Sequence, residues 1–317
     1  MMKLLIDADT GIDDSIAILF ALKRRDVQVV GVTTGCGNTN AMQAAENTIR
    51  LIQLAETPYA VPVVVGANAP LVGEWGGPVP HIHGHNGIGD VDLPPSPQKP
   101  LEEDAADFII RQAKEQAGEL VLVTLGRMTN LALALQKEPR LPHMIKAVVA
   151  MGGTLRAPGN VSPVSEANIA GDPEAADQVL QAGFSLTIVG LDVTTKTRLS
   201  MQHIDLLRKY CKAENEKIVD YLQQALPLYM NFNRAQNYCM DNCPVHDPLA
   251  MLVAVEPCLV KTQRLRMRVE CGGTWCRGML VADLRERPFD AEFVNFSVEV
   301  DGIRAVDTLL AAFCRES

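Results

Sequence analysis

Four aspartates lie within eight residues near the start of the chain, at Asp7, Asp9, Asp13 and Asp14. The apolar run before them predicts a buried strand that ends at Asp7, and the apolar run over residues 15–22 predicts a helix packed on a sheet. The carboxyl end of such a strand is the usual place for a ligand site in an open α/β sheet. A helix start explains one or two capping acids, but four crowded carboxylates repel one another and resist burial. The cluster therefore predicts a hard divalent cation, and Ca²⁺ suits it because it accepts about six to eight oxygen ligands.

A second acidic position lies far along the chain, in the stretch CPVHDPLAM at residues 243–251. Asp247 precedes Pro248 and an apolar run, which is also the pattern of a helix N-cap followed by proline. Taken together with the N-terminal acids, Asp247 becomes a candidate metal ligand and His246 a candidate acid or substrate contact.

Further polar groups follow other expected strands at their carboxyl ends. Asn38 follows the second strand, and the backbone carbonyl of Leu125 ends the fourth. A long Gly/Pro/Asn-rich loop over residues 152–171 follows the fifth strand. That loop carries three polar side chains, Asn160, Glu166 and Asn168. Amides and carboxylates together satisfy hydroxyl donors and acceptors, so this set suits a hydroxyl-rich ligand.

Strand-like apolar runs alternate with helical patterns through the first half of the chain, which is typical of a parallel sheet covered by helices. The expected strands cover residues 3–9, 27–34, 61–65, 119–125, 145–151 and 185–192. The expected helices cover residues 14–25, 40–55, 102–117, 129–137 and 172–182. Residues 200–256 are expected to be mostly helical, with a polar interruption at 231–245. Strands near 263–271, 276–283 and 293–300 then precede a helix from residue 302. The predicted fold is α/β, an open, mostly parallel Rossmann-like sheet with helices on both faces and additional C-terminal helices and small strands, in a single domain over residues 1–317.

Length, charge and cysteine spacing exclude several classes of protein. The chain has 317 residues, of which 47% are apolar and 21% charged, so it can bury a sizeable core. A net charge of −9 argues against a nucleic-acid or anionic-membrane surface. We find no signal-peptide pattern and no apolar run near the roughly 18–20 residues of a membrane span, so a cytoplasmic protein is expected. The eight cysteines lack zinc-site spacing and are expected to be free thiols.

The motifs occur in an order that resembles the inosine–uridine-preferring nucleoside hydrolase family. D-x-D-x-G-x-D-D at residues 7–14 matches the signature of that family. Five further blocks follow in the family's order: GN at 37–38, GRMTN at 126–130, MGG at 151–153, E-x-N at 166–168 and HDP at 246–248. The resemblance covers residues 3 to about 255 and is weaker beyond.

By that resemblance, the protein would hydrolyse the N-glycosidic bond of ribonucleosides to free base and ribose, with Ca²⁺ as its cofactor. The oxygen ligands of the Ca²⁺ would come from Asp9, Asp14, Asp247 and the carbonyl of Leu125. Asp13 would be the general base for a metal-bound water, Asn38 would help to position that water, and Asp7 would support the site. The chemistry fits because carboxylates stabilise an oxocarbenium-like transition state and a metal ion acidifies the attacking water.

The same resemblance implies how the substrate binds. The ribose hydroxyls would be bound by Asn160, Glu166 and Asn168, with Met151 packed beneath the sugar. His83 and His246 would flank the base, and a histidine there could give the leaving base its proton. Two such histidines favour pyrimidine nucleosides (uridine and cytidine), while purine-preferring and broad-specificity enzymes share these motifs and stay open. A homo-oligomer, either a dimer or a tetramer, is also expected.

The chain departs from the family pattern at several positions. Thr10 stands where proline is usual, and Arg127-Met128 stands where Pro-Leu is usual. None of these side chains is an expected ligand, so we expect little effect on the metal. Cys36 lies next to the block that contains Asn38 and could alter the sugar pocket.

Two loops supply further candidates for the pocket. In HIHGHNGIGD at residues 81–90, His83 matches the family histidine, while His81 and His85 are expected at the surface. In YMNFNRAQNYCMDN at residues 229–242, four side chains could wall the base pocket: Tyr229, Phe232, Asn233 and Tyr238.

Two other function classes fit parts of the pattern. A phosphatase of the haloacid dehalogenase type also has D-x-D after its first strand, but Gly11 occupies the position where that class has Thr or Val. A non-catalytic ribose or nucleoside sensor would keep the sugar ligands and lose the general base, yet Asp13 is present. A dinucleotide-binding Rossmann protein is excluded because no G-x-G-x-x-G follows any expected strand.

Overall fold

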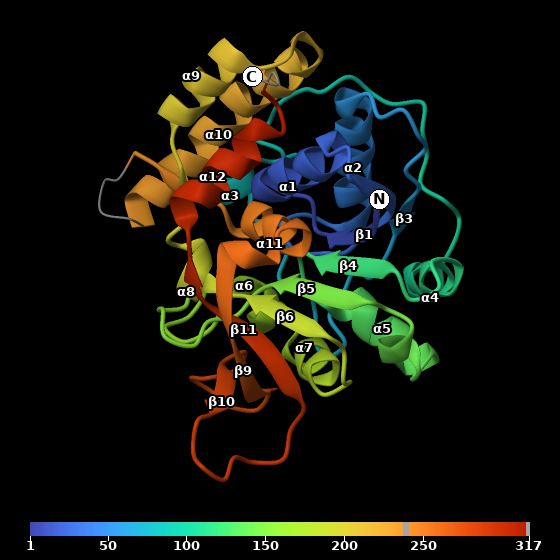
Figure 1. Cartoon of the computed structure of the whole chain (residues 1–317), viewed down its shortest axis with the longest axis vertical. Helices are drawn as coiled ribbons and strands as arrows, with labels where there is room; N and C mark the ends of the chain where they lie inside the picture. The colour runs from blue at the N-terminus through green and yellow to red at the C-terminus, as the bar shows by residue number, and fades with distance from the viewer. Residues whose placement is uncertain (237–240, 315–317) are drawn as a thin grey trace.

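The computed structural model describes residues 1–236 and 241–314. Within these residues, nine strands form one sheet in the order β10-β9-β11-β6-β5-β4-β1-β2-β3 (Figure 1). The strands from β3 to β11 in that order pair in parallel, and β9 and β10 extend the sheet by antiparallel pairing. Their bounds are β1 Met2–Ala8, β2 Val27–Thr34, β3 Val63–Val65, β4 Leu120–Thr124, β5 Ala147–Met151, β6 Leu186–Val189, β9 Val260–Val269, β10 Leu280–Asp283 and β11 Phe293–Val300. The prediction of an α/β fold with an open, mostly parallel sheet is confirmed.

The central parallel strands are apolar on both faces, which is why they form the buried middle of the sheet. In β1, Leu4 and Ile6 belong to the core on one face of the sheet, and Leu5 belongs to the core on the other. Polar residues come where the strands end, and there Asp7 lies in register with Thr33 of β2 and with Thr124 of β4. The strand ends therefore bring acidic and hydroxyl side chains together at one edge of the sheet.

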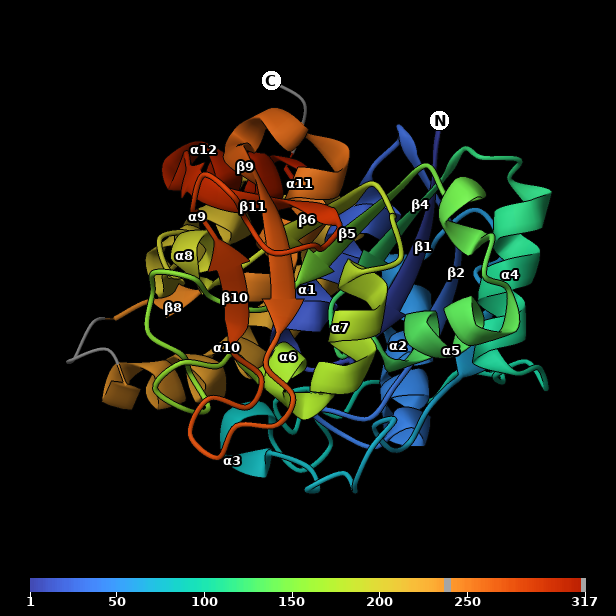
Figure 2. The same ribbon diagram turned by 90° about the horizontal axis from the view of Figure 1, so that it is seen from below.

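Helices cover both faces of the sheet. The first core packs under α1 (Ile12–Lys23), α2 (Ala41–Ala55), α9 (Met201–Tyr210), α10 (Glu216–Gln236), α11 (His246–Val255) and α12 (Gly302–Ala311). The second core packs under α4 (Ala105–Glu115), α5 (Thr129–Lys137) and α7 (Pro173–Leu180). The short elements are α3 (Pro80–His83), α6 (Ala167–Gly171), α8 (Leu191–Thr194) and the paired strands β7 (Arg198–Leu199) and β8 (Cys243–Pro244). In Figure 2, α3 and α6 lie on the lower side of the molecule, toward which the parallel strands run from the N-terminus.

Three parts of the structure differ from the sequence expectations. The strand expected over residues 185–192 ends at Val189, because Gly190 begins the helix α8 and the Leu191 amide bonds to the carbonyl of Gly153. The helical region is not interrupted at residue 231, since α10 continues to Gln236. The C-terminal strands are not a separate addition, because β11 pairs in parallel with β6 and so continues the main sheet.

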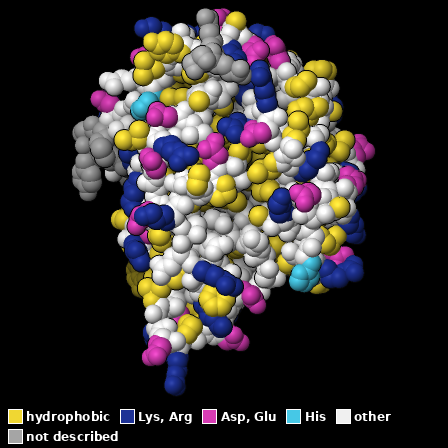
Figure 3. Space-filling view, viewed as in Figure 1, with side chains coloured by type: hydrophobic (Ala, Val, Ile, Leu, Met, Phe, Trp, Pro, Cys, Tyr) yellow, Lys and Arg dark blue, Asp and Glu magenta, His cyan; other side chains and the backbone are white. Residues whose placement is uncertain are grey.

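The surface carries both signs of charge. On the face seen in Figure 3, Lys and Arg side chains lie among Asp and Glu side chains and form no single basic field. Among the helices that the structure describes, none combines the length and apolar character needed to cross a membrane. The thiols of Cys36, Cys243, Cys258, Cys271 and Cys276 are free, as expected, and Cys239 lies outside the described residues.

Candidate active site

A pocket of about 790 Å³ opens at the carboxyl ends of β1, β2, β4 and β5. Eleven of the thirteen residues expected to have a catalytic, substrate-binding, metal-binding or supporting role line it: Asp9, Asp13, Asn38, His83, Leu125, Met151, Asn160, Glu166, Asn168, His246 and Asp247. The other two, Asp7 and Asp14, are buried and do not belong to its lining. The structure therefore brings together side chains that are separated by more than two hundred positions in the sequence, in a cavity of a size that suits a small ligand.

Three carboxylates from two helices form the acidic centre of this pocket, here called the acidic triplet. Asp13 and Asp14 lie in the first turn of α1, Asp247 lies in the first turn of α11, and their ligand atoms lie within 4.8 Å of one another. The Gly11 amide and the Asn38 side chain donate to Asp14 Oδ2, at 2.8 and 3.0 Å. Asp14 Oδ1 is buried and has no hydrogen-bond partner within the described residues. A buried, unpaired carboxylate oxygen among other hard oxygen donors fits a divalent cation.

Asp9 lies beside the triplet but does not belong to it. The Asn38 backbone amide donates to Asp9 Oδ2 at 2.8 Å, and the Asn38 side chain links Asp9 Oδ1 at 3.3 Å to Asp14. Gly37 allows this close approach, since a Cβ at that position would lie 1.7 Å from Asp9 Oδ2. The geometry thus brings Asp13, which the sequence assigned to the general base, as close to Asp14 and Asp247 as a metal ligand would be.

Burial changes the acidity of these carboxyl groups. It raises the pKa of Asp13 to about 6 and that of Asp7 to about 7. It also raises the pKa values of Asp14 and Asp247, and the charges of the neighbouring carboxylates raise them further. These raised pKa values mean that the carboxyl groups hold protons more tightly than free aspartate does, and a bound divalent cation would favour their ionised forms.

Asp7 is held behind the pocket by hydrogen bonds. Its Oδ1 accepts from Thr33 Oγ1 at 2.6 Å and from Asn130 Nδ2 at 2.8 Å. Asn130 also donates to the Thr34 carbonyl and accepts from the Ala67 amide at 2.8 Å. Asn130 therefore holds three strand-end segments together. The GRMTN block located Asn130 after a strand but did not predict these hydrogen bonds.

The buried His83, the half-buried His246 and the buried Tyr229 line another wall. His83 Nδ1 accepts a hydrogen bond from the Ile12 amide at 3.0 Å, so the ring proton is on Nε2. Burial lowers the pKa of His83 to about 3 and that of His246 to about 4, so both rings are neutral near pH 7. His246 Nδ1 lies 2.7 Å from Thr194 Oγ1. The Tyr229 hydroxyl donates to Asp13 Oδ2 at 3.3 Å, a contact that the sequence did not predict.

The remaining candidates for the base pocket divide between the pocket lining and the surface. Phe232 and Asn233 line the pocket as expected, and Tyr238 lies outside the described residues. His81 and His85 are exposed, as predicted, and the His81 ring meets the Phe232 ring edge-on at 5.7 Å between centroids.

The polar residues of the loop after β5 also hold the local backbone. Glu166 caps α6, because its carboxylate accepts from the amides of Asn168 at 2.8 Å, Gly153 at 2.8 Å and Ile169 at 3.1 Å. Asn168 Nδ2 donates to the Leu125 carbonyl at 2.6 Å. A carboxylate has about four lone-pair sites, so Glu166 can still accept a ligand hydroxyl.

Asn160 and Met151 complete this part of the pocket. Asn160 is exposed, and its Oδ1 accepts from the Ala167 amide at 3.0 Å, which leaves its Nδ2 donors to face solvent or ligand. Met151 ends β5 and is buried, with its sulfur 3.2 Å from Asn168 Nδ2.

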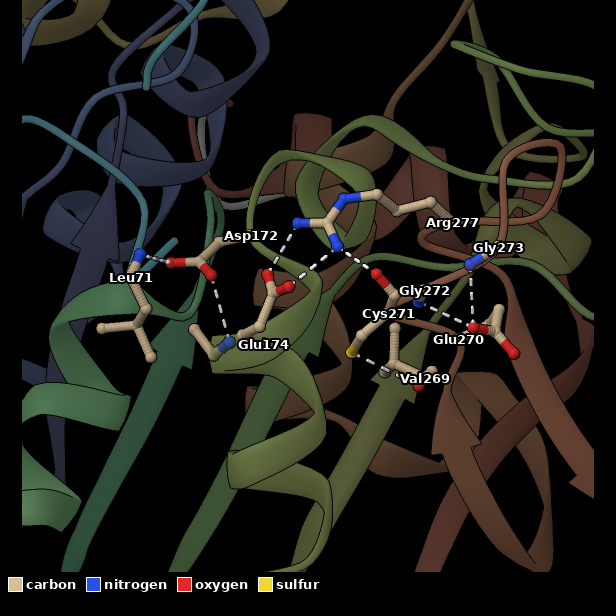
Figure 4. A network of polar contacts seen from close by, with 10 residues as sticks. Leu71, Asp172, Glu174, Val269, Glu270, Cys271, Gly272, Gly273 and Arg277 are labelled. Carbon is tan, nitrogen blue, oxygen red and sulfur yellow. Dashed lines mark hydrogen bonds and ion pairs between the residues drawn. The ribbon is translucent and has the colours of Figure 1, made fainter. Parts of the chain in front are cut away.

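A hairpin from the C-terminal part of the chain supports α6 from outside. Between β9 and β10, Arg277 pairs with Glu174 of α7 through two contacts of 2.8 Å, and it also donates to the Cys271 carbonyl (Figure 4). Glu270 accepts from two backbone amides of the same turn, those of Gly272 and Gly273. A Cβ at Gly278 would lie 2.6 Å from the Cα of Ala170, so the hairpin also rests against α6, which carries one wall of the pocket.

The whole chain is similar to known nucleoside hydrolases. The family model for inosine-uridine preferring nucleoside hydrolase matches residues 4–308. The chain is 37% identical over 282 residues to Uridine nucleosidase 1 of Arabidopsis thaliana, across 89% of this chain and 82% of that protein. It superposes on the solved structure of a plant nucleoside hydrolase, PpNRh1, with a TM-score of 0.92 at 32% identity over 99% of both chains. It superposes on the purine-preferring ribonucleoside hydrolase from Gardnerella vaginalis with a TM-score of 0.90 at 35% identity over 98% of both chains.

Proposed function

The chain belongs to the inosine–uridine preferring nucleoside hydrolase family and is an N-glycosyl hydrolase of ribonucleosides, and we propose that it acts with Ca²⁺ and that uridine and cytidine are among its substrates. Because the chain belongs to this family of enzymes, the phosphatase and the non-catalytic sensor are no longer alternatives. The observation that carries the proposal is the acidic triplet in the pocket, with the unpaired Oδ1 of Asp14 at its centre.

The residues that would hold the cation are Asp14, Asp247, Asp9 and the carbonyl of Leu125. Their donor atoms are all hard oxygens, which Ca²⁺ prefers, and no sulfur or imidazole nitrogen competes in this set. When bound, the cation would orient the ribose 2′- and 3′-hydroxyls and lower the pKa of the attacking water. The Leu125 carbonyl accepts a hydrogen bond from Asn168, and this contact supports a role for Asn168 at the sugar.

Asp13 is proposed as the general base that takes the proton of the attacking water. Its pKa of about 6 leaves it largely ionised at neutral pH yet close enough to that pH to accept a proton effectively. The Tyr229 hydroxyl fixes the orientation of Asp13 by donating to Oδ2. The side-chain nitrogen of Asn38 donates to Asp9 and Asp14, so its Oδ1 would face the water. Asp7 would keep the strand end in place behind the site.

The sugar and the base would occupy opposite parts of the pocket. Asn160, Glu166 and Asn168 would bind ribose hydroxyls above Met151, and the ionised carboxylates would stabilise positive charge that develops on the sugar. His83 and His246 would flank the base. His246 would protonate the leaving base in its imidazolium form, which is a strong acid because burial lowers the pKa of His246 to about 4, and it would return to the neutral ring. His83 instead offers its Nε2–H as a hydrogen-bond donor.

The preference for pyrimidines is supported by the two histidines and by the name of the Arabidopsis relative, a uridine nucleosidase. The Gardnerella enzyme, which is named purine-preferring, superposes with a TM-score of 0.90 over 98% of both chains and favours the second candidate, a purine-preferring or broad-specificity hydrolase. The base would be chosen by side chains at the wall formed by α3 and α10. If His83 contacts a pyrimidine, His83→Ala should reduce uridine turnover more than inosine turnover.

The direct test is base release from inosine, adenosine, uridine and cytidine by the purified protein with Ca²⁺ and without phosphate. Formation of free base and ribose in a 1:1 ratio supports the proposal, and the highest kcat/KM should belong to a pyrimidine nucleoside. Faster turnover of inosine than of uridine would replace the pyrimidine assignment by the purine-preferring one. No turnover of any of the four would contradict the proposal.

A further inference from the structure

Arg127 is a cationic side chain in a pocket whose other charged side chains are carboxylates. It is the one Lys or Arg among the described residues of the lining, whereas Asp9, Asp13, Glu166 and Asp247 all contribute carboxylates. A guanidinium carries five N–H donors. Within residues 1–236 and 241–314, Arg127 makes one hydrogen bond, from Nη1 to Cys36 Sγ at 3.7 Å, and no ion pair. Sulfur is a weak acceptor, so most of these donors are available to a ligand.

The backbone makes room for this guanidinium. A Cβ at Gly171, the last residue of α6, would lie 2.3 Å from Arg127 Nε and 2.8 Å from Cζ. Glycine at this position therefore lets the arginine pack against the end of α6 and remain in the pocket wall. A side chain held in this way loses less entropy when it binds a ligand.

Arg127 lies at the sugar side of the pocket. It follows the Leu125 carbonyl at the end of β4 and packs against α6, the helix that is capped by Glu166 and contains Asn168. The residues that would flank the base come instead from α3, α10 and α11, which belong to the other side of the sheet. A nucleoside with its base among those helices would turn its ribose toward Arg127.

Only one hydroxyl of the ribose is free to carry an additional group. In the proposed function, on which this inference rests, the 2′- and 3′-hydroxyls face the cation at the acidic triplet, so the 5′-hydroxyl remains. The pocket carboxylates would repel an anionic group there unless a cationic side chain met it, and arginine binds phosphate oxygens with two parallel hydrogen bonds. We propose that Arg127 binds a 5′-phosphate, so that the substrates of this site include ribonucleoside 5′-monophosphates.

The reaction on such a substrate leaves the phosphate ester intact. The water oxygen forms a bond to C1′, and the C1′–N bond breaks with its electron pair passing to the base nitrogen. Asp13 takes one proton of the water, and the base nitrogen receives a proton. The products are the free base and ribose 5-phosphate, and no oxidant, reductant or second substrate is needed.

The test compares kcat/KM for a nucleoside and for its 5′-monophosphate, with uridine and inosine as the two nucleosides. Free base and ribose 5-phosphate are measured for the wild type, Arg127→Met and Arg127→Lys. We expect the wild type to hydrolyse a monophosphate. The monophosphate-to-nucleoside ratio should fall about tenfold or more in Arg127→Met and recover in part in Arg127→Lys. The charge of Arg127 also favours the ionised form of Asp9. An arginine with that effect alone would, when replaced, lower both rates and leave the ratio unchanged.

A matched control and a binding measurement complete the experiment. Arg140→Met removes an exposed arginine that pairs with Glu138 away from the pocket, and it should leave the ratio unchanged. Calorimetry with Ca²⁺ present should show ribose 5-phosphate binding more tightly than ribose to the wild type, and this advantage should be lost in Arg127→Met.

The results that would overturn this inference differ from those that would contradict the proposed function. Hydrolysis of nucleosides without their 5′-monophosphates, or an equal ratio in the wild type and Arg127→Met, would overturn the inference and leave the proposed function standing. An equal Arg127 dependence with nucleoside 3′-monophosphates would overturn the assignment to the 5′ position. Failure to hydrolyse any nucleoside or monophosphate would contradict the proposed function, and the inference would fall with it.

Discussion

At the level of single residues, Asp14 has the strongest need for a positive partner. Its Oδ2 accepts two hydrogen bonds, while its buried Oδ1 accepts none within the described part of the chain. Desolvating such an oxygen without a partner costs free energy, and the nearby carboxylates of Asp13 and Asp247 increase that cost. A divalent cation would coordinate this oxygen and offset the repulsion among the three carboxylates.

Replacing Asp247 by asparagine should therefore abolish Ca²⁺ binding. Asp247→Asn keeps the size of the side chain and removes one negative ligand, so we expect the calorimetric Ca²⁺ signal to disappear and kcat/KM to fall at least about 100-fold. Asp205→Asn on α9, where the side chain is exposed, is the matched control and should behave as the wild type. Unchanged Ca²⁺ affinity in Asp247→Asn would remove Asp247 from the metal site.

Tyr229 should influence the pH dependence of catalysis through Asp13. Burial raises the pKa of Asp13, and the hydrogen bond from Tyr229 acts in the opposite direction. Tyr229→Phe removes that bond, so the pKa of Asp13 should rise. A general base works when it is deprotonated, so the acid limb of kcat/KM against pH should move to higher pH. Phe232→Leu, a change in the same pocket, should alter KM without moving the limb. If the limb stays in place in Tyr229→Phe, Asp13 is not the base.

At the level of elements, the β9–β10 hairpin should affect the pocket by holding α6. Gly278 has a φ of +81°, and a Cβ there would lie 2.6 Å from the Cα of Ala170, which lines the pocket. We expect Gly278→Ala to lower the free energy of unfolding by about 1–3 kcal/mol and to raise KM, as measured by urea unfolding and steady-state kinetics. Gly272→Ala in the same turn meets only Glu270 Oε1 at 3.6 Å and should be neutral. Equal effects of the two substitutions would contradict a specific role for the contact with Ala170.

Local patterns predicted the elements better than they predicted the contacts. The alternation of apolar runs with helical patterns was sufficient to predict β1 to β6, and the acids at the strand ends were sufficient to locate the pocket. Both signals depend on residues that are neighbours in the sequence. The pairing of β11 with β6 depends on a distant segment and was not predictable. For the same reason no local pattern indicated that Tyr229 contacts Asp13, that Glu166 caps α6, or that Arg127 enters the pocket.

At the level of the whole molecule, Ca²⁺ binding should make stability depend on pH in a defined direction. The raised pKa values of Asp7 and Asp13, about 7 and about 6, mean that the folded protein without metal binds protons more tightly than the unfolded chain. The stability from these groups is fully present below about pH 4 and is lost as the pH rises through 6 and 7.

Ca²⁺ requires the ionised carboxylates, so its stabilising effect should grow over the same range. The increase in Tm on adding excess Ca²⁺ should be a few degrees at pH 8 and should become much smaller at pH 5. Thermal unfolding at several pH values, with and without Ca²⁺, measures this difference. A Ca²⁺-induced increase that is as large at pH 5 as at pH 8 would contradict a site made of these carboxylates.

The single sheet also leads us to propose that residues 1–317 unfold as one domain. The N-terminal strand β1 lies in the middle of the sheet, and β11 from the C-terminal region lies between β6 and β9, so the two ends of the sequence share one core. We expect one cooperative thermal transition with equal calorimetric and van't Hoff enthalpies for the assembled protein. Two separate transitions would contradict a single domain. Sedimentation velocity would test the expected dimer or tetramer, and a monomer would contradict it.

The most direct test of the central claim is release of uracil from uridine by protein stripped of metal, before and after Ca²⁺ is added. The structure has three carboxylates and an unpaired buried oxygen at the proposed cation position, so the stripped protein should be inactive and added Ca²⁺ should restore the release of uracil and ribose. Full activity of the stripped protein would contradict a calcium site at Asp14 and Asp247 on which catalysis depends.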